Sequence, residues 1–519
     1  MKGESESVTE ANAIRTHGNR IRKIYQFWAI LIAVAMISSA LTLVAIGDGP
    51  SFPTIIEPGS LVDDAKYIIF QDGATYYAKN GMTGGIDDSD TNATSLIREV
   101  LSSGLTPGRT SPERITLLGD YVVYRITLPS NTTFDIRGSV TLADGADDHL
   151  FYSSSTTNVT ICGGLIDGNK ANQPETLLNC IIYFTNVNKF QIRDSHIVNG
   201  AYANIWLVTC SNGAVFENTL SGSTHNVVLL SGGSTIALRN NIVTEPGSES
   251  FDVRGGGVNI LVTGNLINGD GNAGVICSQN YRTIISNNVM QDVTFGVYLD
   301  AGASGNIVTG NRIYDTSDAA ILIRDSDENL VANNYLDNIW FNGITLNRAN
   351  NNTISGNVIK DVCQYGDGSP YYSIFVTGTI PCENNTITEN TFMHSLPNRP
   401  AFLIRVDATH KDTVIRFNDM VAGQSTGQKI SNVGTRTVIE FNLGYTTENS
   451  GSITVTGAVS FITPSHGLIL TPTIITITGN NSGIGWAVIT TITLTQFVIT
   501  FENQPGASIW KFYWYAEVR

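Results

Sequence analysis

One asparagine position recurs through most of the chain at an almost constant spacing, in segments such as VTGNLI, ISNNVM and VANNYL. Its occupants are Asn218, Asn241, Asn265, Asn288, Asn311, Asn334, Asn357, Asn390, Asn418 and Asn442. Successive spacings are 23, 24, 23, 23, 23, 23, 33, 28 and 24 residues, and we assign His196 to the same position in an earlier repeat. A period of this length is typical of solenoids, in which each repeat packs on the one before.

A second segment of each repeat alternates apolar and variable residues. It reads NIWLV, SFDVR, GVYLD, AILIR and GITLN at 204–208, 250–254, 296–300, 320–324 and 343–347. Alternation with a period of two residues indicates a β-strand. A repeat of this length has room for two or three short strands with tight turns, which predicts a parallel β-helix. A leucine-rich repeat would need the LxxLxLxxN consensus, and a propeller blade nearly twice the period.

Stacked coils would place the asparagine amides in one column, where each amide can bond the next coil. Loss of one such buried amide should cost about 1–3 kcal/mol. The open ends of a solenoid need covers. Residues 89–103 carry helix start signals and apolar residues at helical spacing, which predicts a capping helix. The asparagine repeat stops near residue 445, and the short alternating segments of 446–519 predict a separate small β-sandwich.

The N-terminal region contains an uncharged apolar stretch at 24–46. At about 1.5 Å per residue, a helix of this length spans a bilayer core of about 30 Å. Basic residues precede the stretch and acidic residues follow it, so the positive-inside rule predicts a cytoplasmic N-terminus and an exported remainder. The predicted order is a cytoplasmic tail (1–23), a transmembrane signal anchor (24–46), a linker (47–69), the β-helix with its cap (70–445) and the C-terminal module (446–519). A cleaved signal peptide is the alternative, and it exports the same residues.

Several modifications are compatible with export. Sequons for N-glycosylation begin at Asn92, Asn131, Asn158, Asn351, Asn384 and Asn480. Six cysteines are present and none forms a CxxC pair, which argues against a structural zinc site. Cys363 and Cys382 flank one irregular insertion and could form a disulfide or remain thiols.

Charge and acidic clusters limit the classes of partner. The net charge is −15 and no Lys/Arg-rich run occurs, so nucleic acid is not an expected partner. Two acidic clusters are present, at 87–90 and 144–148. Such clusters form turns and helix caps more often than calcium loops, so we predict no cofactor, and calcium is supported by no specific motif.

At this point the chain resembles the pectate-lyase-like superfamily of right-handed parallel β-helix proteins, over about 70–445. The resemblance rests on YYAKNG, GIDDSDTNATSLIREVL, ITLLGDYVV and ITLPSNTTFDIRG, followed by repeats similar to those of NosD-type surface proteins. It implies an all-β fold in which the first coils follow a capping helix. It implies no single activity, because the superfamily includes lyases, hydrolases, epimerases, phage tailspikes and proteins without catalysis.

Enzymes of that superfamily act in a lateral groove, so outward residues of the second strand are candidates. Asp252, Arg254, Asp300 and Arg324 form a charged group there, and Tyr298 is a candidate ligand-stacking residue. Two carboxylates can hydrolyse a glycosidic bond with inversion when they lie about 6.5–9.5 Å apart. Alternating Asp and Arg on a solvated sheet face are also ordinary cross-strand pairs, each worth under about 1 kcal/mol.

The preferred interpretation is a membrane-anchored, extracellular β-helix protein that binds a polysaccharide or cell-surface glycan. One alternative is a polysaccharide lyase or glycoside hydrolase that uses the lateral groove. Another is a structural or adhesive envelope component that forms homo-oligomers through its C-terminal module. A groove in which the carboxylates and arginines converge would favour an enzyme, whereas a face of paired charges would favour a binding protein or a scaffold.

Overall fold

The computed structural model describes residues 65–102, 113–176, 179–269, 271–367, 370–445 and, with further gaps, 448–517. The chain divides into two compact units, Met1–Val62 and Asp63–Arg519, and all described residues belong to the second. The predicted tail, signal anchor and most of the linker (1–64) lie outside the described residues. None of the helices in the described part is both long enough and apolar enough to cross a lipid bilayer.

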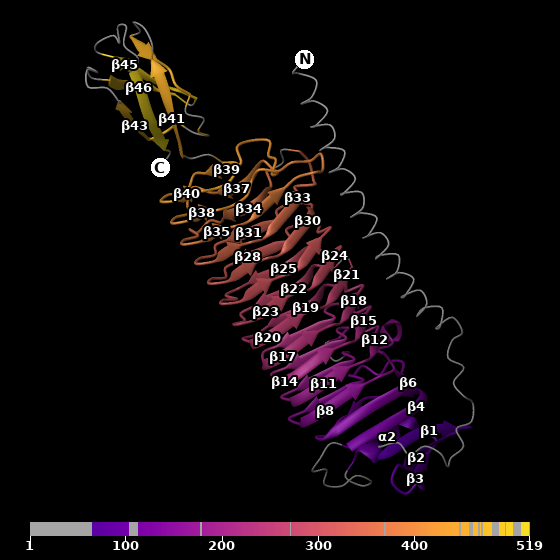
Figure 1. Cartoon of the computed structure of the whole chain (residues 1–519). Coiled ribbons are helices and arrows are strands. Elements are labelled where there is room, and N and C mark those ends of the chain that lie inside the picture. The colour runs from indigo at the N-terminus through magenta and orange to yellow at the C-terminus, as the bar shows by residue number, and fades with distance from the viewer. Residues whose placement is uncertain are drawn as a thin grey trace, which may run out of the picture. The chain divides into compact units, whose positions relative to one another are not determined.

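The predicted parallel β-helix is confirmed, because short strands of successive coils pair in parallel and in register (Figure 1). One column of strands forms a 13-stranded sheet. Its strands are β5 (Ile126–Thr127), β7 (Phe151–Ser154), β10 (Ile182–Thr185), β13 (Ile205–Val208), β16 (Val228–Ser231), β19 (Glu249–Arg254), β22 (Ala273–Ser278), β25 (Phe295–Asp300), β28 (Ile321–Arg324), β31 (Ile344–Asn347), β34 (Tyr372–Thr377), β37 (Phe402–Val406) and β39 (Ile430–Asn432).

Two further columns belong to a 27-stranded sheet. The first column contains β8 (Thr157–Cys162), β11 (Asn188–Arg193), β14 (Ser211–Phe216), β17 (Ser234–Arg239), β20 (Val258–Thr263), β23 (Ile284–Ser286), β26 (Ile307–Thr309), β29 (Leu330–Ala332), β32 (Thr353–Ser355), β35 (Thr386–Thr388), β38 (Val414–Arg416) and β40 (Val438–Glu440). The second contains β9 (Leu165–Asp167), β12 (His196–Val198), β15 (Thr219–Ser221), β18 (Ile242–Thr244), β21 (Leu266–Asn268), β24 (Val289–Gln291), β27 (Arg312–Tyr314), β30 (Tyr335–Ile339), β33 (Val358–Val362) and β36 (Thr391–Met393). Most coils therefore contribute one strand to each of three faces.

The core lies between the three faces. Inward residues of paired strands fall on the same register positions, so like residues stack on like. Ile321 pairs with Ile344, and the same column continues through Ile374, Ile404 and Ile430, all of them buried. Burial of this kind stabilises the fold by about 25 cal/mol for each Å² of apolar surface removed from water.

The predicted asparagine column is present at all ten positions, and every member is buried. Asn334 shows the pattern: its Oδ1 accepts from both the backbone N and the Nδ2 of Asn311, at 3.0 Å each. Its own Nδ2 donates to Oδ1 of Asn357 at 2.9 Å and to the carbonyl oxygen of Val308 at 2.9 Å. Each amide therefore satisfies buried backbone groups and links neighbouring coils.

The structure adds a second, parallel asparagine column and corrects one position of the first. Asn306, Asn329, Asn352 and Asn385 repeat the same pattern of bonds in consecutive coils. Ser195, and not the predicted His196, takes the place of asparagine in the earlier coil, because the backbone N of Ser195 donates to Oδ1 of Asn218 at 3.1 Å. His196 is exposed at the start of β12.

The predicted capping helix is α2 (Ala93–Leu101), whose buried face contains the predicted Leu96, Ile97, Val100 and Leu101. Oδ1 of Asn92 caps it by accepting from the backbone N of Ser95. Strands β1 (Tyr67–Asp72), β2 (Thr75–Asn80) and β3 (Ile86–Asp90) pair antiparallel beside it. The long β4 (Glu113–Val123) and β6 (Thr132–Leu142) begin the parallel stack, and a short 3-10 turn follows at Lys170–Asn172.

The C-terminal module contains two three-stranded antiparallel sheets. One consists of β41 (Glu448–Val455), β46 (Trp510–Glu517) and β43 (Ile474–Gly479), and the other of β42 (Phe461–Ile462), β45 (Phe497–Phe501) and β44 (Ala487–Ile492). Residues of both sheets share one buried cluster that includes Phe497 and Trp514. That the two sheets form a β-sandwich stays a prediction.

Candidate functional site

A column of aromatic side chains runs across the outer face of the 13-stranded sheet. Register places Tyr152, Tyr183 and Trp206 on consecutive strands β7, β10 and β13, followed by Leu229 and Asp252 on β16 and β19. Since paired parallel strands lie about 4.8 Å apart, in-register rings form a continuous line. We call Tyr152, Tyr183 and Trp206, together with the neighbouring rings of His149, Tyr202 and His225, the aromatic belt.

The rings of the aromatic belt contact one another from coil to coil. The ring centroids of Tyr152 and Tyr183 lie 5.9 Å apart in a stacked arrangement, and those of Tyr183 and Trp206 lie 5.2 Å apart edge to face. Tyr202 lies 5.8 Å from Trp206 and 4.8 Å from His225. The rings of Tyr152, Tyr183, Trp206, Tyr202 and His225 are half-buried. The belt is therefore held by mutual packing and keeps part of its surface available to solvent.

Burial shifts the pKa of three residues of the belt toward the neutral form. His149 is 5% exposed and stacks on Tyr183 at 4.3 Å between centroids. Desolvation lowers the pKa of His149 to about 4, so its imidazole is uncharged near neutral pH. Burial also raises the pKa of Tyr183 and of Tyr202 above the usual range for a phenol. The indole Nε1 of Trp206 donates to Oγ of Ser231 at 3.0 Å, which fixes the orientation of that ring.

Polar groups flank the far end of the belt. Nδ2 of Asn226 donates to Oδ2 of Asp252 at 2.7 Å and to Oε2 of Glu249 at 3.2 Å. Nε of Arg254 donates to Oδ1 of Asp252 at 2.9 Å, and its Nη2 contacts Oδ2 of the same carboxylate. Nε2 of His225 lies 2.8 Å from Oε1 of Glu175. At this end Arg254 is exposed and Glu249 and His225 are half-buried next to the aromatic rings, whereas Asn226 and Asp252 are buried.

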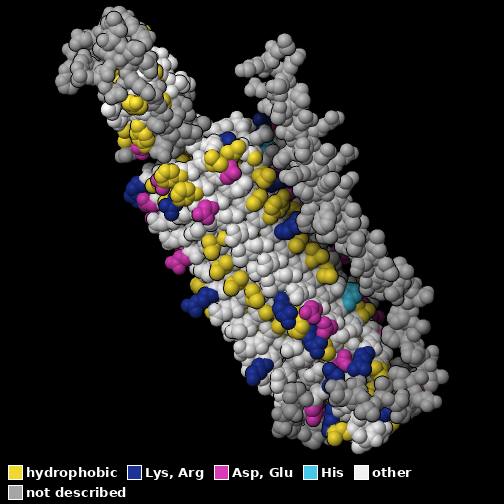
Figure 2. Space-filling model, viewed as in Figure 1, with side chains coloured by type: hydrophobic (Ala, Val, Ile, Leu, Met, Phe, Trp, Pro, Cys, Tyr) yellow, Lys and Arg dark blue, Asp and Glu magenta, His cyan; other side chains and the backbone are white. Residues whose placement is uncertain are grey.

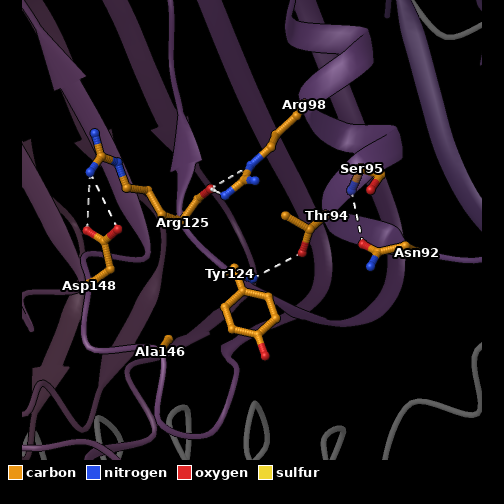
Figure 3. Close-up of a pocket in the computed structure, with 8 residues that line it drawn as sticks. All are labelled: Asn92, Thr94, Ser95, Arg98, Tyr124, Arg125, Ala146 and Asp148. Carbon is orange, nitrogen blue, oxygen red and sulfur yellow. Dashed lines mark hydrogen bonds and ion pairs between the residues drawn. The ribbon is translucent and has the colours of Figure 1, made fainter.

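A pocket adjoins the near end of the belt (Figure 3). Its volume is about 350 Å³, and it is lined by Asn92, Thr94, Ser95, Arg98, Tyr124, Arg125, Ala146 and Asp148. The guanidinium of Arg125 lies 4.1 Å above the ring of Tyr152 and 3.4 Å from the carboxylate of Asp148. Arg125 therefore belongs both to the pocket and to the edge of the belt.

The predicted charged residues are paired with each other and do not converge on one point. Nε and Nη2 of Arg324 donate to the two carboxylate oxygens of Asp300 at 2.8 and 2.7 Å. Asp252, predicted as an accessible carboxylate, is only 1% exposed because Asn226 and Arg254 cover it. Arg254 and Asp300 occupy equivalent positions on strands two coils apart. Asp252 occupies the position equivalent to that of Tyr298.

The two aspartates also lie on different coils. Asp252 and Asp300 are two coils and two residues apart in register, which corresponds to about 12 Å between Cα atoms at the usual strand dimensions. Tyr298, predicted to stack on a ligand, is 7% exposed and has the guanidinium of Arg324 5.0 Å from its ring centroid. On the face shown in Figure 2, basic and acidic side chains lie next to one another at several places.

Of the two possibilities for Cys363 and Cys382, the structure has the thiols and not the disulfide. All six cysteines are buried free thiols. Sγ of Cys363 donates to the carbonyl oxygen of Gly366 at 3.4 Å, and Sγ of Cys382 to that of Thr377 at 3.2 Å. Glycosylation stays a prediction: Asn92, Asn158, Asn351 and Asn384 are exposed and Asn131 is half-buried, while Asn480 lies outside the described residues.

Metal-ligating side chains are dispersed. In the part of the chain that the structure describes, no three His, Cys, Asp or Glu side chains are placed to share a metal ion. The acidic clusters bond to the protein itself: Asp87 accepts from Tyr67 and Asn80, and Asp147 accepts from Thr176 and Asn179.

Comparison with known proteins agrees with this fold. The family model for the periplasmic copper-binding protein NosD matches residues 157–340 and 257–414. No match was found among curated proteins. The described residues do not fit a copper site of clustered ligands, since the six thiols are buried and separate and no His, Cys or carboxylate group of three is present among them.

Two solved structures show the same architecture. The A-module of mannuronan C-5 epimerase AlgE4 from Azotobacter vinelandii is 13% identical, with a TM-score of 0.50 over 67% of this chain and 96% of the module. The tailspike protein of E. coli bacteriophage HK620, in complex with pentasaccharide, is 12% identical, with a TM-score of 0.55 over 82% of this chain and 90% of the tailspike chain. At these identities the likeness establishes the fold. The chain is a right-handed parallel β-helix protein, and its residues 157–414 are similar to the NosD family model.

Proposed function

We propose that this chain is an exported, membrane-anchored protein that binds carbohydrate along the aromatic belt. The observation that carries the proposal is the line of half-buried rings from Tyr152 through Tyr183 to Trp206. Aromatic rings present large apolar faces with little conformational entropy to lose, and they suit ligands that are apolar on one side and polar on the other. Sugar rings are ligands of this kind.

The polar groups around the belt match the hydroxyl groups of a sugar. Glu249, His225 and Arg254 bring carboxylate, imidazole and guanidinium groups to the far end, and they can donate or accept hydrogen bonds there. The HK620 tailspike, which has the same fold, was solved with a bound pentasaccharide. The pairing of Asp300 with Arg324 and of Asp252 with Arg254 supports binding over catalysis in the lateral groove.

Anchoring at the cell surface rests on the sequence. The uncharged stretch at 24–46, with basic residues before it, supports a single-pass membrane segment with the belt on the extracellular side. Protease treatment of intact cells tests this orientation. Digestion of the β-helix with protection of an N-terminal fragment is expected, and protection of the whole chain would contradict it.

Binding is tested with the full-length chain in detergent micelles on a panel of neutral and acidic oligosaccharides. Trp206→Ala is expected to weaken binding of any ligand found by at least about tenfold, or about 1.4 kcal/mol. Trp340→Ala is the matched control, because Trp340 is exposed but lies several coils away, directly after β30 of the 27-stranded sheet. Equal affinities for the wild-type chain and Trp206→Ala would contradict the proposal.

A further inference from the structure

The last two coils of the β-helix carry an exposed apolar surface. Phe417 and Phe441 directly follow β38 and β40, and they are 50% and 57% exposed. Their rings stack on each other with 5.5 Å between centroids. Val421, Val438 and Leu443, from the same two coils, are exposed as well. We call these five residues the terminal patch, and Figure 2 shows hydrophobic side chains gathered at this end of the β-helix.

The two phenylalanines have an unfavourable backbone conformation. The φ angles of Phe417 and Phe441 are 56° and 52°, in the left-handed region that bulky residues rarely adopt. Backbone strain of this kind is concentrated at functional contacts. The equivalent position in earlier coils, directly before the buried asparagine, has glutamate or a residue that tolerates this region, namely Asn240, Gly264, Asn287, Gly310, Asn333 and Gly356. The fold therefore does not require phenylalanine there, and the exposed rings are expected to serve a contact.

The charges next to the terminal patch are balanced. Nη1 of Arg416 lies 4.0 Å from Oε1 of Glu440 in the next coil. The guanidinium of Arg416 also lies 5.6 Å from the ring centroid of Phe417. A paired arginine and glutamate give no preference for a charged ligand, so the surface fits an uncharged aromatic or apolar partner.

The C-terminal module has an exposed surface of this chemistry. In its central strand β46, Phe512 and Trp514 are buried, whereas Tyr513 and Tyr515 point to the opposite face and are 46% and 37% exposed. Side chains alternate between the two faces of a strand, so the two tyrosines lie on one face. Their neighbours on β43 are the exposed threonines Thr478 and Thr476.

Only a short length of chain separates the two surfaces. The last coil ends with Tyr445, which is buried in the core of the β-helix, and β41 begins at Glu448. Three residues span at most about 11 Å. A short link of this kind gives an effective concentration of about 1 mM. A contact with a Kd of only about 0.1 mM would then be closed about 90% of the time.

We propose that the C-terminal module docks on the terminal patch of its own chain, with Tyr513 and Tyr515 against Phe417 and Phe441. Among the described residues, β39 and β40 each pair with a preceding strand only. An open sheet edge favours association with other chains. The docked module covers this end of the β-helix, as α2 covers the other end. The contact is separate from the proposed binding of carbohydrate at the aromatic belt.

Hydroxyl-radical footprinting of the full-length chain in detergent tests the contact, because the oxidation rate of a ring reports its exposure to solvent. The variant is Phe417→Asn with Phe441→Asn, which introduces the residue that several equivalent turns already have. The oxidation rates of Tyr513 and Tyr515 should rise by up to about tenfold, as the open fraction increases from about 10% to nearly all molecules. Equal rates in the variant and the wild-type chain would overturn the proposal.

The reciprocal variant, Tyr513→Ser with Tyr515→Ser, leaves the β-helix unchanged and should raise the oxidation rates of Phe417 and Phe441. Unchanged rates at these two rings would show that the tyrosines do not cover the patch. Tyr281→Asn is the matched control, because Tyr281 is 49% exposed on a coil in the middle of the β-helix. It should leave the rates of Tyr513 and Tyr515 as they are in the wild-type chain.

Dilution separates docking within one chain from association of two chains. The protection of Phe417, Phe441, Tyr513 and Tyr515 in the wild-type chain should stay the same after hundredfold dilution, since the tether fixes the local concentration. Protection that is lost on dilution would show that a second copy covers the patch, and it would overturn the proposal.

Discussion

The ring of Trp206 meets the ring of Tyr183 from the neighbouring coil edge to face, with 5.2 Å between their centroids. The contact is set by the parallel register of β10 and β13, which places the two residues directly opposite each other. A solenoid thus turns one outward position per coil into a continuous surface. Its length is fixed by the number of coils that carry a suitable side chain.

The length of the ligand site follows from that geometry. Arg125 precedes β5 and Asp252 lies on β19, five strand spacings along the sheet, which is about 24 Å. For a series of oligosaccharides of increasing length, affinity should rise until the ligand spans about this distance and then stay constant. Titration calorimetry measures the series. An affinity that is independent of length from the disaccharide onward would contradict a site of this extent.

The asparagine column should contribute strongly to stability. Asn334→Ala removes two acceptor contacts to Asn311 and leaves the buried carbonyl of Val308 and Oδ1 of Asn357 without this donor. We expect a loss of about 1–3 kcal/mol in the free energy of unfolding, measured by urea denaturation. Thr353→Ala, on the half-buried surface of β32, is the control and should change it by less than about 0.5 kcal/mol. Similar losses in both variants would contradict a special role for the column.

Stability should fall in mild acid because of buried histidine. The pKa of His149 is lowered to about 4 in the folded chain from an ordinary value of 6.5, since burial disfavours the charged imidazole. The unfolded chain therefore takes up the proton first, and stability is lost as the pH falls from 6.5 to 4, by up to about 3 kcal/mol.

His149→Phe keeps a ring against Tyr183 and cannot be protonated. The drop in unfolding free energy between pH 7.5 and pH 4.5 should be smaller in this variant than in the wild-type chain. Some decline should remain, because burial also lowers the pKa of His410, whose Nδ1 accepts from the backbone N of Cys382. An equal drop in variant and wild type would show that His149 does not carry the effect.

The cysteines should be reduced and unreactive. Burial raises the pKa of Cys180 and of Cys277 to about 12 and that of Cys210 to about 11, so little thiolate forms near neutral pH. Ellman's reagent should react slowly with the native chain and with six thiols after denaturation without reductant. Four reactive thiols would instead reveal a disulfide.

The coil architecture could be predicted from the sequence because every stacked coil requires the same type of residue at the same position. Each coil needs a buried amide at the same corner, so Asn288, Asn311 and Asn334 recur at 23-residue intervals. The second column, at Asn306 and Asn329, lies five residues before the first in each coil. Its asparagines recur in the sequence at the same 23-residue spacing. His196 was misplaced by one residue because its coil has serine at the corner, which breaks the pattern.

The aromatic belt could not be predicted in the same way. Tyr152, Tyr183 and Trp206 are separated by 31 and 23 residues, because the coil between β7 and β10 contains an insertion with the turn at Lys170–Asn172. Register alone brings them into line. Nor does alternation along β19 reveal that Asp252 is covered, since the covering groups Asn226 and Arg254 come from the preceding coil and from the same strand.

The most direct test of carbohydrate binding at the belt is a crystal structure of the chain with a bound oligosaccharide identified in the binding panel. We predict ordered sugar rings against Tyr183 and Trp206, with the chain directed along the column toward Tyr152. Sugars ordered only at Asp300 and Arg324, or only on the C-terminal module, would contradict the account.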